Sequence, residues 1–304
     1  VVALVRERRP AGLVALALAA AGWAVAQQPE PLVPAAAGEG LVGLDWLIVD
    51  GLVVVFVILP LERFLPHRPG PLARPEWQTD ARYFVVNHLA VHALGLFAAV
   101  VAASSLGWAH ARTAASGLAA MPVVLQVLLL LVVTDLVQYW LHRMMHEVPW
   151  MWRFHAVHHS SKNLDALAGS RIHLLETLVT RSAIFAAFHA LGLPFEAFLG
   201  YAAIIALQGT FIHANVRLRY GWLEHVIVSP RYHHWHHASD AEAIDTNYAG
   251  TFPFLDRLFG THHLPSSERD RPERWPLRYG VVKEAVPTTL VAQQRFPFAR
   301  AAER

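Results

Sequence analysis

Long apolar blocks, each followed by a polar segment, recur along the chain as far as about residue 212. The stretch LVGLDWLIVDGLVVVFVILPLE at residues 41–62 contains two Asp but is otherwise almost entirely apolar. Two further blocks cover residues 83–106 and 121–141. Because about 20 apolar residues suffice for a helix to cross a bilayer, each block predicts a membrane-spanning helix.

A longer apolar block at residues 174–212 is interrupted by Gly192 and Pro194. Both residue types end helices, so this block predicts either a helical hairpin or two segments that reach half the membrane depth. Earlier in the chain, VRERRP precedes AGLVALALAAAGWAVAQQ. This order of basic, apolar and small residues is typical of a signal peptide, and it fits a short first membrane span equally well.

Lysine and arginine concentrate in the polar segments, at residues 6–9, 63–82, 143–181 and from 217 onward. If the four apolar blocks between about residue 11 and residue 141 all cross the membrane, every basic cluster falls on the same side. The positive-inside rule makes that side cytoplasmic. We therefore expect an integral protein of the cell's inner (plasma) membrane, with membrane lipids around its apolar helices.

Composition supports a membrane protein and argues against several other classes. Hydrophobic residues make up 55% of the chain and charged residues 16%, whereas soluble domains carry about 25% charged residues. The net charge of only +2 and the lack of a basic stripe interleaved with aromatic residues argue against nucleic acid as a partner. No cysteine is present, so thiolate metal sites and cysteine nucleophiles are excluded, but the chain has 19 histidines.

Three dense histidine groups, in LHRMMHE, WRFHAVHHS and SPRYHHWHH, share a helical spacing. Spacings of three and four residues place the rings on one helix face, and His234 alone falls off this stripe. FIHANV adds a further histidine at the end of the last apolar block. The candidate ligands are His142, His146, His155, His158, His159, His213, His233, His236 and His237.

The number of these histidines favours a site for two metal ions. Imidazole binds zinc, copper, iron and nickel well, but one tetrahedral zinc takes only four ligands. The alternatives are an incidental basic surface or a metal-buffering tract. Buffering tracts are low in complexity, whereas these groups repeat one spacing beside apolar helices.

The remaining histidines are weaker candidates. His88 and His92 form an i, i+4 pair inside an apolar block and could lie near a metal. Isolated histidines are usually surface residues or hydrogen-bonded core residues. We expect this of His67, His110, His189 and His225.

The histidine pattern resembles that of the fatty acid hydroxylase / sterol desaturase superfamily, the membrane-bound non-haem di-iron enzymes. The family order HxxxH, HxxHH, HxxHH is matched by the groups that begin at His142, His155 and His233. The segments SRIH (with a downstream Glu), FIHAN and DTNYAGTFPFLDRLFGTH also resemble the family. The resemblance covers roughly residues 45–265.

The resemblance implies an all-α integral membrane protein with about four transmembrane helices and a cytoplasmic helical cap that holds a histidine-rich dimetal site. We expect three regions. Residues 1–40 form a signal-like or first membrane segment and loop, residues 41–265 a fatty acid hydroxylase-like membrane domain, and residues 266–304 a polar C-terminal tail.

The resemblance also implies the chemistry. Two non-haem iron ions, held by the nine histidines, would use O2 as co-substrate to hydroxylate or desaturate a lipid or sterol-like substrate. Since no haem-binding HPGG motif is present, electrons would come from a separate donor of the cytochrome b5, ferredoxin or reductase type.

The sequence departs from the family pattern at two positions. Leu174 replaces a proline that often follows the SRIH-type histidine, and Gly209 stands where some members carry another histidine. His173 is therefore a tenth candidate ligand, which could supply the missing partner.

Other residues have candidate supporting roles. Carboxylates that orient imidazoles are common at metal sites, and the candidates are Asp165, Glu176, Asp240 and Asp245. Arg171 and Asn247 are candidates for holding the cap together. Aromatic residues could anchor at the membrane interface, the favoured role, or line a substrate slot: Trp140, Trp150, Trp152, Phe154 and Trp235.

Two other functions compete with an oxygenase. A membrane zinc hydrolase is disfavoured because His146-Glu147 lacks the second histidine of HExxH, and no GxSxG motif is present. A metal transporter or buffer is disfavoured because transport sites usually lie at mid-membrane depth, whereas these groups lie at the ends of apolar blocks and beyond.

Overall fold

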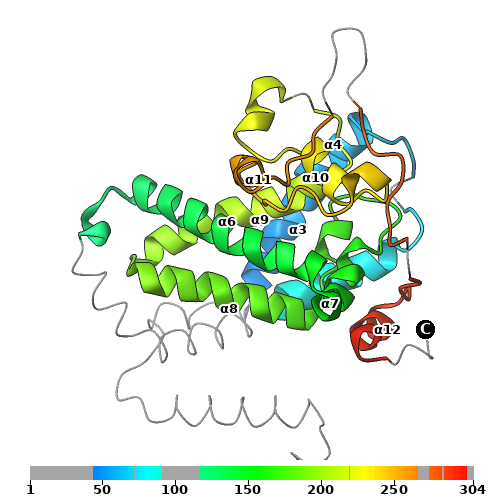
Figure 1. Ribbon diagram of the computed structural model, residues 1–304, viewed down its shortest axis with the longest axis horizontal. Coiled ribbons are helices and arrows are strands. Elements are labelled where there is room, and N and C mark those ends of the chain that lie inside the picture. Colours follow the sequence, from blue (N-terminus) through cyan, green and yellow to red (C-terminus); the bar gives the residue numbers. More distant parts are fainter. Residues whose placement is uncertain are drawn as a thin grey trace, which may run out of the picture.

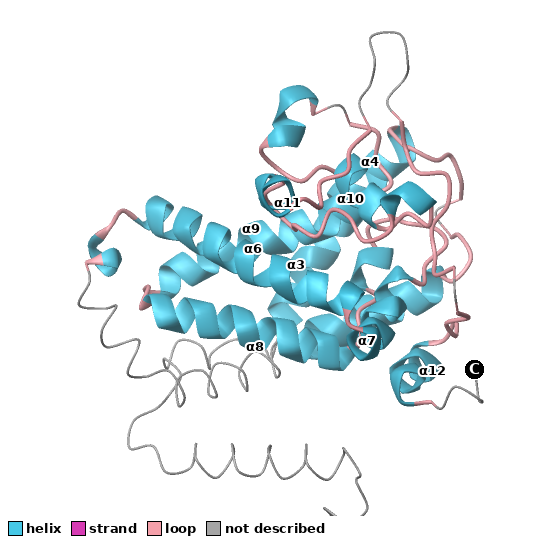
Figure 2. Ribbon diagram, viewed as in Figure 1, coloured by secondary structure: helices cyan, strands magenta, loops and turns pink. Residues whose placement is uncertain are grey.

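The computed structural model describes residues 44–299, apart from 72, 91–116, 219, 266–273 and 283. The expected signal-like segment or first span at residues 1–40 and most of the block at 83–106 lie outside the described residues. The described part is helical, with only two isolated β-bridges and no strand (Figure 2).

Three helices in the described part are long and apolar enough to cross a membrane: α6 (Val123–Glu147), α8 (Leu174–Leu191) and α9 (Phe195–His213). They run side by side along the longest dimension of the molecule (Figure 1). Leu130 and Leu131 of α6 pack with Ile184 of α8 and with Ala197 and Tyr201 of α9. This interface joins the three helices.

The predicted break in the last apolar block is present. Helix α8 ends at Gly192, whose left-handed φ of 62° suits glycine, and Pro194 precedes α9. The rings of Phe185 and Phe198 pack 4.9 Å apart across the connection. Of the two alternatives, the structure has the hairpin, so the end of α8 and the start of α9 lie at the same end of the bundle.

The first apolar block forms a continuous helical segment made of α3 (Leu44–Val53), the π-helical turn η2 (Val54–Ile58) and α4 (Leu59–Phe64). A second helical segment begins at residue 77 and is described as far as residue 90. Asp50 and His88 join the two segments, with 2.8 Å between carboxylate and imidazole. Of the expected total of about four transmembrane helices, three candidates are therefore present among the described residues.

Shorter helices and long loops form a cap over one end of the long helices (right side of Figure 1). The α-helices of the cap are α7 (Pro149–His159), α10 (Pro230–His236), α11 (Phe254–Phe259) and α12 (Leu290–Arg295). Short 3-10 turns connect elements here and at the far end of α6: η3 (Leu118–Ala120), η4 (Ala168–Ser170), η5 (Gly221–His225), η6 (Ala241–Ala243) and η7 (Phe296–Phe298).

A carboxylate on α6 fixes one of the cap loops. Asp135 is 4% exposed and accepts hydrogen bonds from the backbone N–H groups of Gly250, Thr251 and Phe252, at 3.0, 3.1 and 2.7 Å. Three donors on one carboxylate satisfy backbone groups that burial would otherwise leave unpaired. The loop is therefore held directly against the middle of α6.

A buried ion network ties the start of the helical segment 77–90 to the SRIH segment. Arg171, which is fully buried, donates to Asp80 at 2.5 Å and to Glu76 at 2.8 Å. Arg74 donates twice to Asp165, at 2.6 Å each, and pairs with Asp80 at 2.7 Å. Each charge in the network has an opposite partner, so removing any one of these side chains would leave an uncompensated buried charge.

Part of the segment that we expected to be a polar tail, residues 266–304, packs on the cap. Among residues 284–299, Gln293 and Phe296 are buried. Gln294 accepts a hydrogen bond from the backbone N–H of Leu174 and donates to the hydroxyl of Tyr83. Polar side chains in this part of the segment therefore bind other parts of the protein.

Candidate metal centre

Nine histidines meet at the junction of the cap and the long helices. They form two groups, in each of which one ligand atom per residue lies within 4.8 Å of all the others. The first histidine group comprises His142, His146, His155, His159 and His236. The second comprises His158, His213, His233 and His237. The two groups together contain the same nine residues that the sequence pattern singled out.

Local helix geometry brings these residues together. His142 and His146 lie one turn apart at the end of α6, and Pro149 begins α7 after a break at Val148. This break turns α7 so that its histidines meet those of α6. The third motif lies on α10, where Ser229 caps the helix by accepting a hydrogen bond from the N–H of Tyr232 at 3.2 Å.

A hydrogen bond at Nδ1 fixes the orientation of five of the rings. In four of them Nδ1 lies at hydrogen-bond distance from a backbone carbonyl oxygen: His142 to Tyr248 at 2.8 Å, His158 to Arg171 at 3.1 Å, His213 to Gly209 at 2.6 Å, and His236 to Thr246 at 2.8 Å. In the fifth ring, His155, Nδ1 lies 2.7 Å from the carboxylate of Glu176. A carbonyl oxygen can only accept, and so can an ionised carboxylate, so Nδ1 carries the proton in these rings and Nε2 presents a lone pair.

These Nε2 atoms point at one another. In the first group, Nε2 of His155 lies 3.0 Å from that of His142 and 3.1 Å from that of His159. In the second group, Nε2 of His213 lies 2.9 Å from that of His233 and 3.3 Å from that of His158. Where both partners hold their proton on Nδ1, as His142 and His155 do, no hydrogen bond can join the two lone pairs.

The arrangement therefore fits metal ions. Facing lone pairs repel each other unless a cation lies between them, and neutral imidazole is a common ligand of transition metals. Nε2 of His146 is also buried, with no hydrogen-bond partner among the described residues. Fixing a ligand ring by a hydrogen bond at its other nitrogen is typical of metal sites. Five and four nitrogen atoms are suitable sets for two separate ions.

Burial favours the neutral form of five of the nine histidines. It lowers the pKa of His236 to about 3. Burial, reinforced by neighbouring imidazoles, holds the pKa of four more rings well below the usual value of 6.5: His158, His159, His233 and His237. Neutral imidazole is the form that binds metals, so the site is ready for metal at neutral pH.

The four candidate supporting carboxylates have different positions. Glu176 contacts His155 as described, and Asp245 lies 3.5 Å from Nδ1 of His146. Asp165 instead binds Arg74, and Asp240 accepts hydrogen bonds from the N–H groups of Leu277 and Arg278. Most of the oriented rings contact backbone carbonyls, which the sequence prediction did not consider.

Arg171 and Asn247 each join different segments of the cap, as expected of residues that hold it together. Arg171 belongs to the buried ion network, and its carbonyl oxygen binds His158. Asn247, in a left-handed conformation with φ of 59°, donates to the carbonyl oxygens of Tyr232 and His263. The side chain thus joins α10 to the loop that follows it.

The structure gives His173 a different role from the one expected of it. This residue lies outside both histidine groups. Its Nδ1 accepts a hydrogen bond from the N–H of Leu175 at 3.1 Å, and its Nε2 donates to the carbonyl oxygen of Gln294 at 3.0 Å. Nδ1 thus caps the start of α8 and Nε2 binds Gln294, so both nitrogens of His173 have partners outside the histidine groups. Gly209 contributes its carbonyl oxygen, which binds His213.

The weaker histidine candidates that the structure describes lie outside the two groups. His88 binds Asp50 and the carbonyl oxygen of Phe84. His67 stacks on Trp275 with a ring separation of 3.9 Å. His189 lies on α8 and His225 ends η5. His92 and His110 are outside the described residues.

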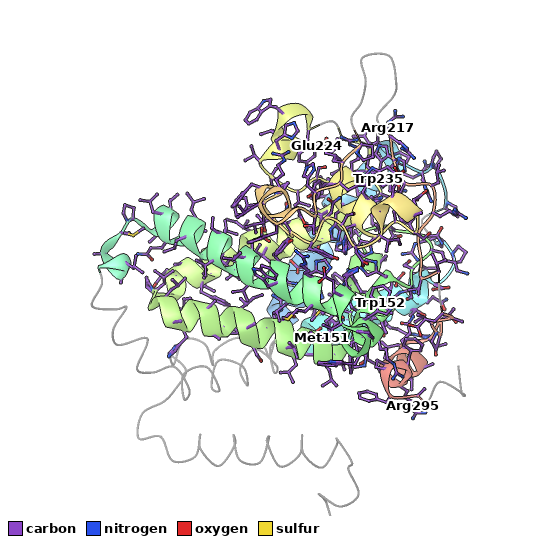
Figure 3. All side chains as sticks on the ribbon, in the orientation of Figure 1. Met151, Trp152, Arg217, Glu224, Trp235 and Arg295 are labelled. Atoms are coloured by element: carbon purple, nitrogen blue, oxygen red, sulfur yellow. The ribbon has the colours of Figure 1, made fainter. Side chains whose placement is uncertain are left out.

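The candidate aromatic anchors divide into exposed and internal residues. Trp140 and Trp150 are exposed, as interfacial anchors would be. Trp235 is buried inside the cap, and Trp152 packs 5.1 Å from the ring of His146 (Figure 3). Phe154 packs 5.0 Å from His173. The expectation of an interfacial role is therefore wrong for Trp235, because its side chain fills the cap instead.

Three features of the site were missed in the sequence. Gly169 approaches His213 so closely that a Cβ there would lie 2.7 Å from the ring. The Nε2 of His234 lies within hydrogen-bond distance of the carbonyl oxygens of His213 and Ala214. Asp135 holds the loop after Asn247. A charged residue in the middle of an apolar block was the available signal for Asp135, but the sequence offers none for Gly169.

The fold and the site define a class: a helical membrane protein with a histidine-rich candidate metal centre at one end of its long helices. Comparisons with known proteins identify the family within this class. A family model described as fatty acid hydroxylase matches residues 127–261. Ornithine lipid hydroxylase OlsE of Rhizobium tropici is 32% identical over 232 residues, covering 73% of this chain and 68% of that protein.

Other relatives match a shorter part. Alkylglycerol monooxygenase of Homo sapiens is 35% identical over 127 residues, covering 42% of this chain and 28% of that protein. Fatty acid hydroxylase vlmA of Lecanicillium sp is 30% identical over 148 residues, covering 43% of this chain and 40% of that protein. No solved structure matches the chain.

The chain belongs to the fatty acid hydroxylase family, which confirms the resemblance seen in the sequence motifs. Its relatives are named hydroxylases or monooxygenases, so the protein is an enzyme of the oxygenase type.

Proposed function

We infer that the protein is an O2-dependent di-iron oxygenase that hydroxylates a lipid, with desaturation as the related alternative. The observation that carries this proposal is the pair of histidine groups, whose Nε2 atoms face one another at about 3 Å. The names of the relatives, which include a hydroxylase of ornithine lipids and a monooxygenase of alkylglycerols, support a lipid substrate.

The nine histidines would hold the metal. Five imidazoles in the first histidine group and four in the second would bind one iron each. Iron bound there would supply the activation of O2 that attack on an unactivated C–H bond requires. Because all nine ligands are neutral, the total charge of the site would stay positive, which favours an electron-demanding centre.

The surrounding residues would prepare the site. Glu176 and the backbone carbonyls fix the imidazole orientations, and the buried cap keeps bulk water away from them. The apolar helices α6, α8 and α9 would let the substrate's hydrocarbon part stay in the membrane.

The chain would receive electrons from a separate donor of the cytochrome b5, ferredoxin or reductase type. Its cap would face the cytoplasm, in the inner (plasma) membrane.

Substitution of single histidines tests the proposal. We expect His158→Ala and His236→Ala, one from each group, to abolish O2-dependent formation of an oxidised lipid, measured by mass spectrometry of lipids from expressing cells. Both variants should still insert into the membrane, and elemental analysis should find two irons per chain in the unaltered protein and fewer in the variants.

His189→Ala is the matched control, because His189 lies on α8 outside both groups. Its product and metal content should equal those of the unaltered protein. Full turnover in either ligand variant would disprove the assignment of the ligands. One zinc per chain with hydrolysis of a lipid, or metal flux without product, would favour the two competing functions.

A further inference from the structure

An exposed apolar patch lies beside the cap end of α6. We call it the collar, and it consists of Trp222 and Val226, in and after η5, together with Phe254 and Leu258 on α11. Trp222 is 72% exposed and Leu258 is 68% exposed. Large apolar side chains gathered at this level of exposure usually mark a binding surface.

Contacts hold the two parts of the collar together and against α6. Arg257 of α11 donates to the carbonyl oxygen of His225 at 3.4 Å and also contacts its ring. At the end of α11, the ring of Phe259 packs 4.9 Å from those of Tyr139 and Trp140. In Figure 1, α11 lies beside α6, and the short yellow helix η5 stands beyond α11 at the top of the view.

The collar continues an apolar stripe on α6. Leu128, Val132, Leu136 and Trp140 are all exposed and lie four residues apart, so they share one face of the helix. Trp140 is about 26 Å along the helix axis from Val123, at 1.5 Å per residue. A hydrocarbon core about 30 Å thick that begins near Val123 would therefore end close to the level of the collar.

The inner side of the collar is anchored to the helix that carries the third histidine motif. Glu224 of η5 is buried and pairs with Arg231 of α10 at 2.5 Å, and it accepts a hydrogen bond from Ser229 at 2.9 Å (Figure 3). His233 follows Arg231 by two residues on α10. The collar and the third histidine motif are therefore directly connected.

We propose that the collar is a membrane-interface anchor, inserted at the headgroup level of the bilayer that surrounds α6, α8 and α9. Its composition suits this partner, because tryptophan and large aliphatic side chains favour the interface between water and hydrocarbon. Arg257, whose guanidinium contacts the rings of His225 and His262, provides a positive charge that would attract anionic headgroups. Through Glu224 and Arg231 the anchor sets the height of α10, and so of its histidines, above the membrane.

Spin labelling in lipid bilayers tests this placement. The chain has no cysteine, so Trp222→Cys and Leu258→Cys each provide one labelling site on an exposed position. Leu277→Cys is the matched control, because Leu277 is 73% exposed and residues 274–282 run along the part of the cap distant from the long helices (Figure 1). Each variant is labelled with a nitroxide and reconstituted in bilayers of phosphatidylcholine and phosphatidylglycerol.

The collision rates of the label with O2, which concentrates in lipid, and with a water-soluble nickel chelate report its depth. The ratio of the O2 rate to the nickel rate should be several-fold higher at positions 222 and 258 than at 277. Equal ratios at all three positions would overturn the proposal, because the collar would then lie in water. Protection of 222 and 258 from both reagents would also overturn it, since a protein partner would then cover the collar.

Discussion

The nitrogen atom that an imidazole turns toward its neighbours is decided by a single contact at the opposite nitrogen. Carbonyl oxygens of Tyr248, Arg171, Gly209 and Thr246 bind four rings in this way, and Glu176 binds the fifth. Such a contact fixes the tautomer, orients the ring and raises its basicity. The quality of an individual ligand therefore depends on groups that do not bind metal themselves.

Glu176 offers a test of this dependence. Replacing it with alanine removes the partner of the His155 Nδ1–H, and we expect metal affinity to fall by about 10-fold to 100-fold. Glu176→Gln retains an acceptor oxygen but not the charge, so its loss should be smaller. Competition with a chelator, followed by elemental analysis, measures both.

The control for this prediction is Glu147→Gln. Glu147 is exposed and pairs with Arg143 on the same helix, and it belongs to neither histidine group. Its substitution should leave metal affinity unchanged. Equal affinities for the alanine, glutamine and unaltered proteins at position 176 would show that the His155 contact has no influence on the metal.

Among helices and turns, the site depends on how closely neighbouring elements approach each other. The turn η4 packs against the end of α9, with Gly169 directly beside His213. Because glycine has no Cβ, the turn can approach the ring. The spacing of histidines along each helix is visible in the sequence. The contact between η4 and α9 is not, because it joins residues that are far apart in the chain and leaves no trace in the spacing of the motifs.

Substitution of Gly169 tests the close approach. In Gly169→Ala the new Cβ would lie 2.7 Å from Cγ of His213, so the ring must move. We expect a loss of about 1–3 kcal/mol in stability, as for other overpacked sites, and a fall in metal content to about half, because only the second histidine group is disturbed. Thermal unfolding and elemental analysis measure the two effects.

Gly209→Ala is the matched control. Gly209 also contacts His213, through its carbonyl oxygen, but a Cβ there would meet nothing within 4 Å. This variant keeps the carbonyl oxygen and should bind as much metal as the unaltered protein. Normal metal content in Gly169→Ala would show that His213 tolerates displacement.

In the molecule as a whole, the long helices and the cap differ in the side chains that they expose and bury. The bundle of α6, α8 and α9 exposes apolar side chains, whereas the cap buries imidazoles and ion pairs. Buried neutral histidines connect the site to the stability of the entire cap, because each of them gains a proton when the protein unfolds in acid.

The metal-free protein should therefore lose stability as the pH falls. Burial lowers the pKa of both His234 and His236 to about 3, so between about pH 6.5 and about pH 3 the unfolded state binds more protons than the folded state. Each such histidine reduces the free energy of unfolding by about 1.4 kcal/mol per pH unit across this range, and above about pH 6.5 it no longer contributes to the slope.

Thermal unfolding of the chelator-treated protein from about pH 7.5 to about pH 5 measures this slope. In His234→Gln one of the buried imidazoles is absent, so the decline should be shallower. A melting temperature that stays constant over this range would contradict the burial of neutral imidazoles.

Local patterns in the amino-acid sequence were enough to predict the helical membrane character, the break at Gly192 and Pro194, the nine histidines that come together, and the family. Each of these follows from periodicity or from motif spacing, which depend on residues close together in the chain. The same local information could not separate His173 from the other candidates, because a histidine that caps a helix has the same sequence appearance as a ligand.

Contacts between distant segments account for the remaining features, which the sequence left open. These contacts determine that the nine histidines form one group of five and one of four. They also determine which nitrogen of a ring faces its neighbours and that residues 284–299 pack on the cap. The physical reason is that these features depend on backbone carbonyls and on close approaches between elements. A carbonyl group is the same in every residue, so its position beside an imidazole is set by packing and not by the identity of the side chain.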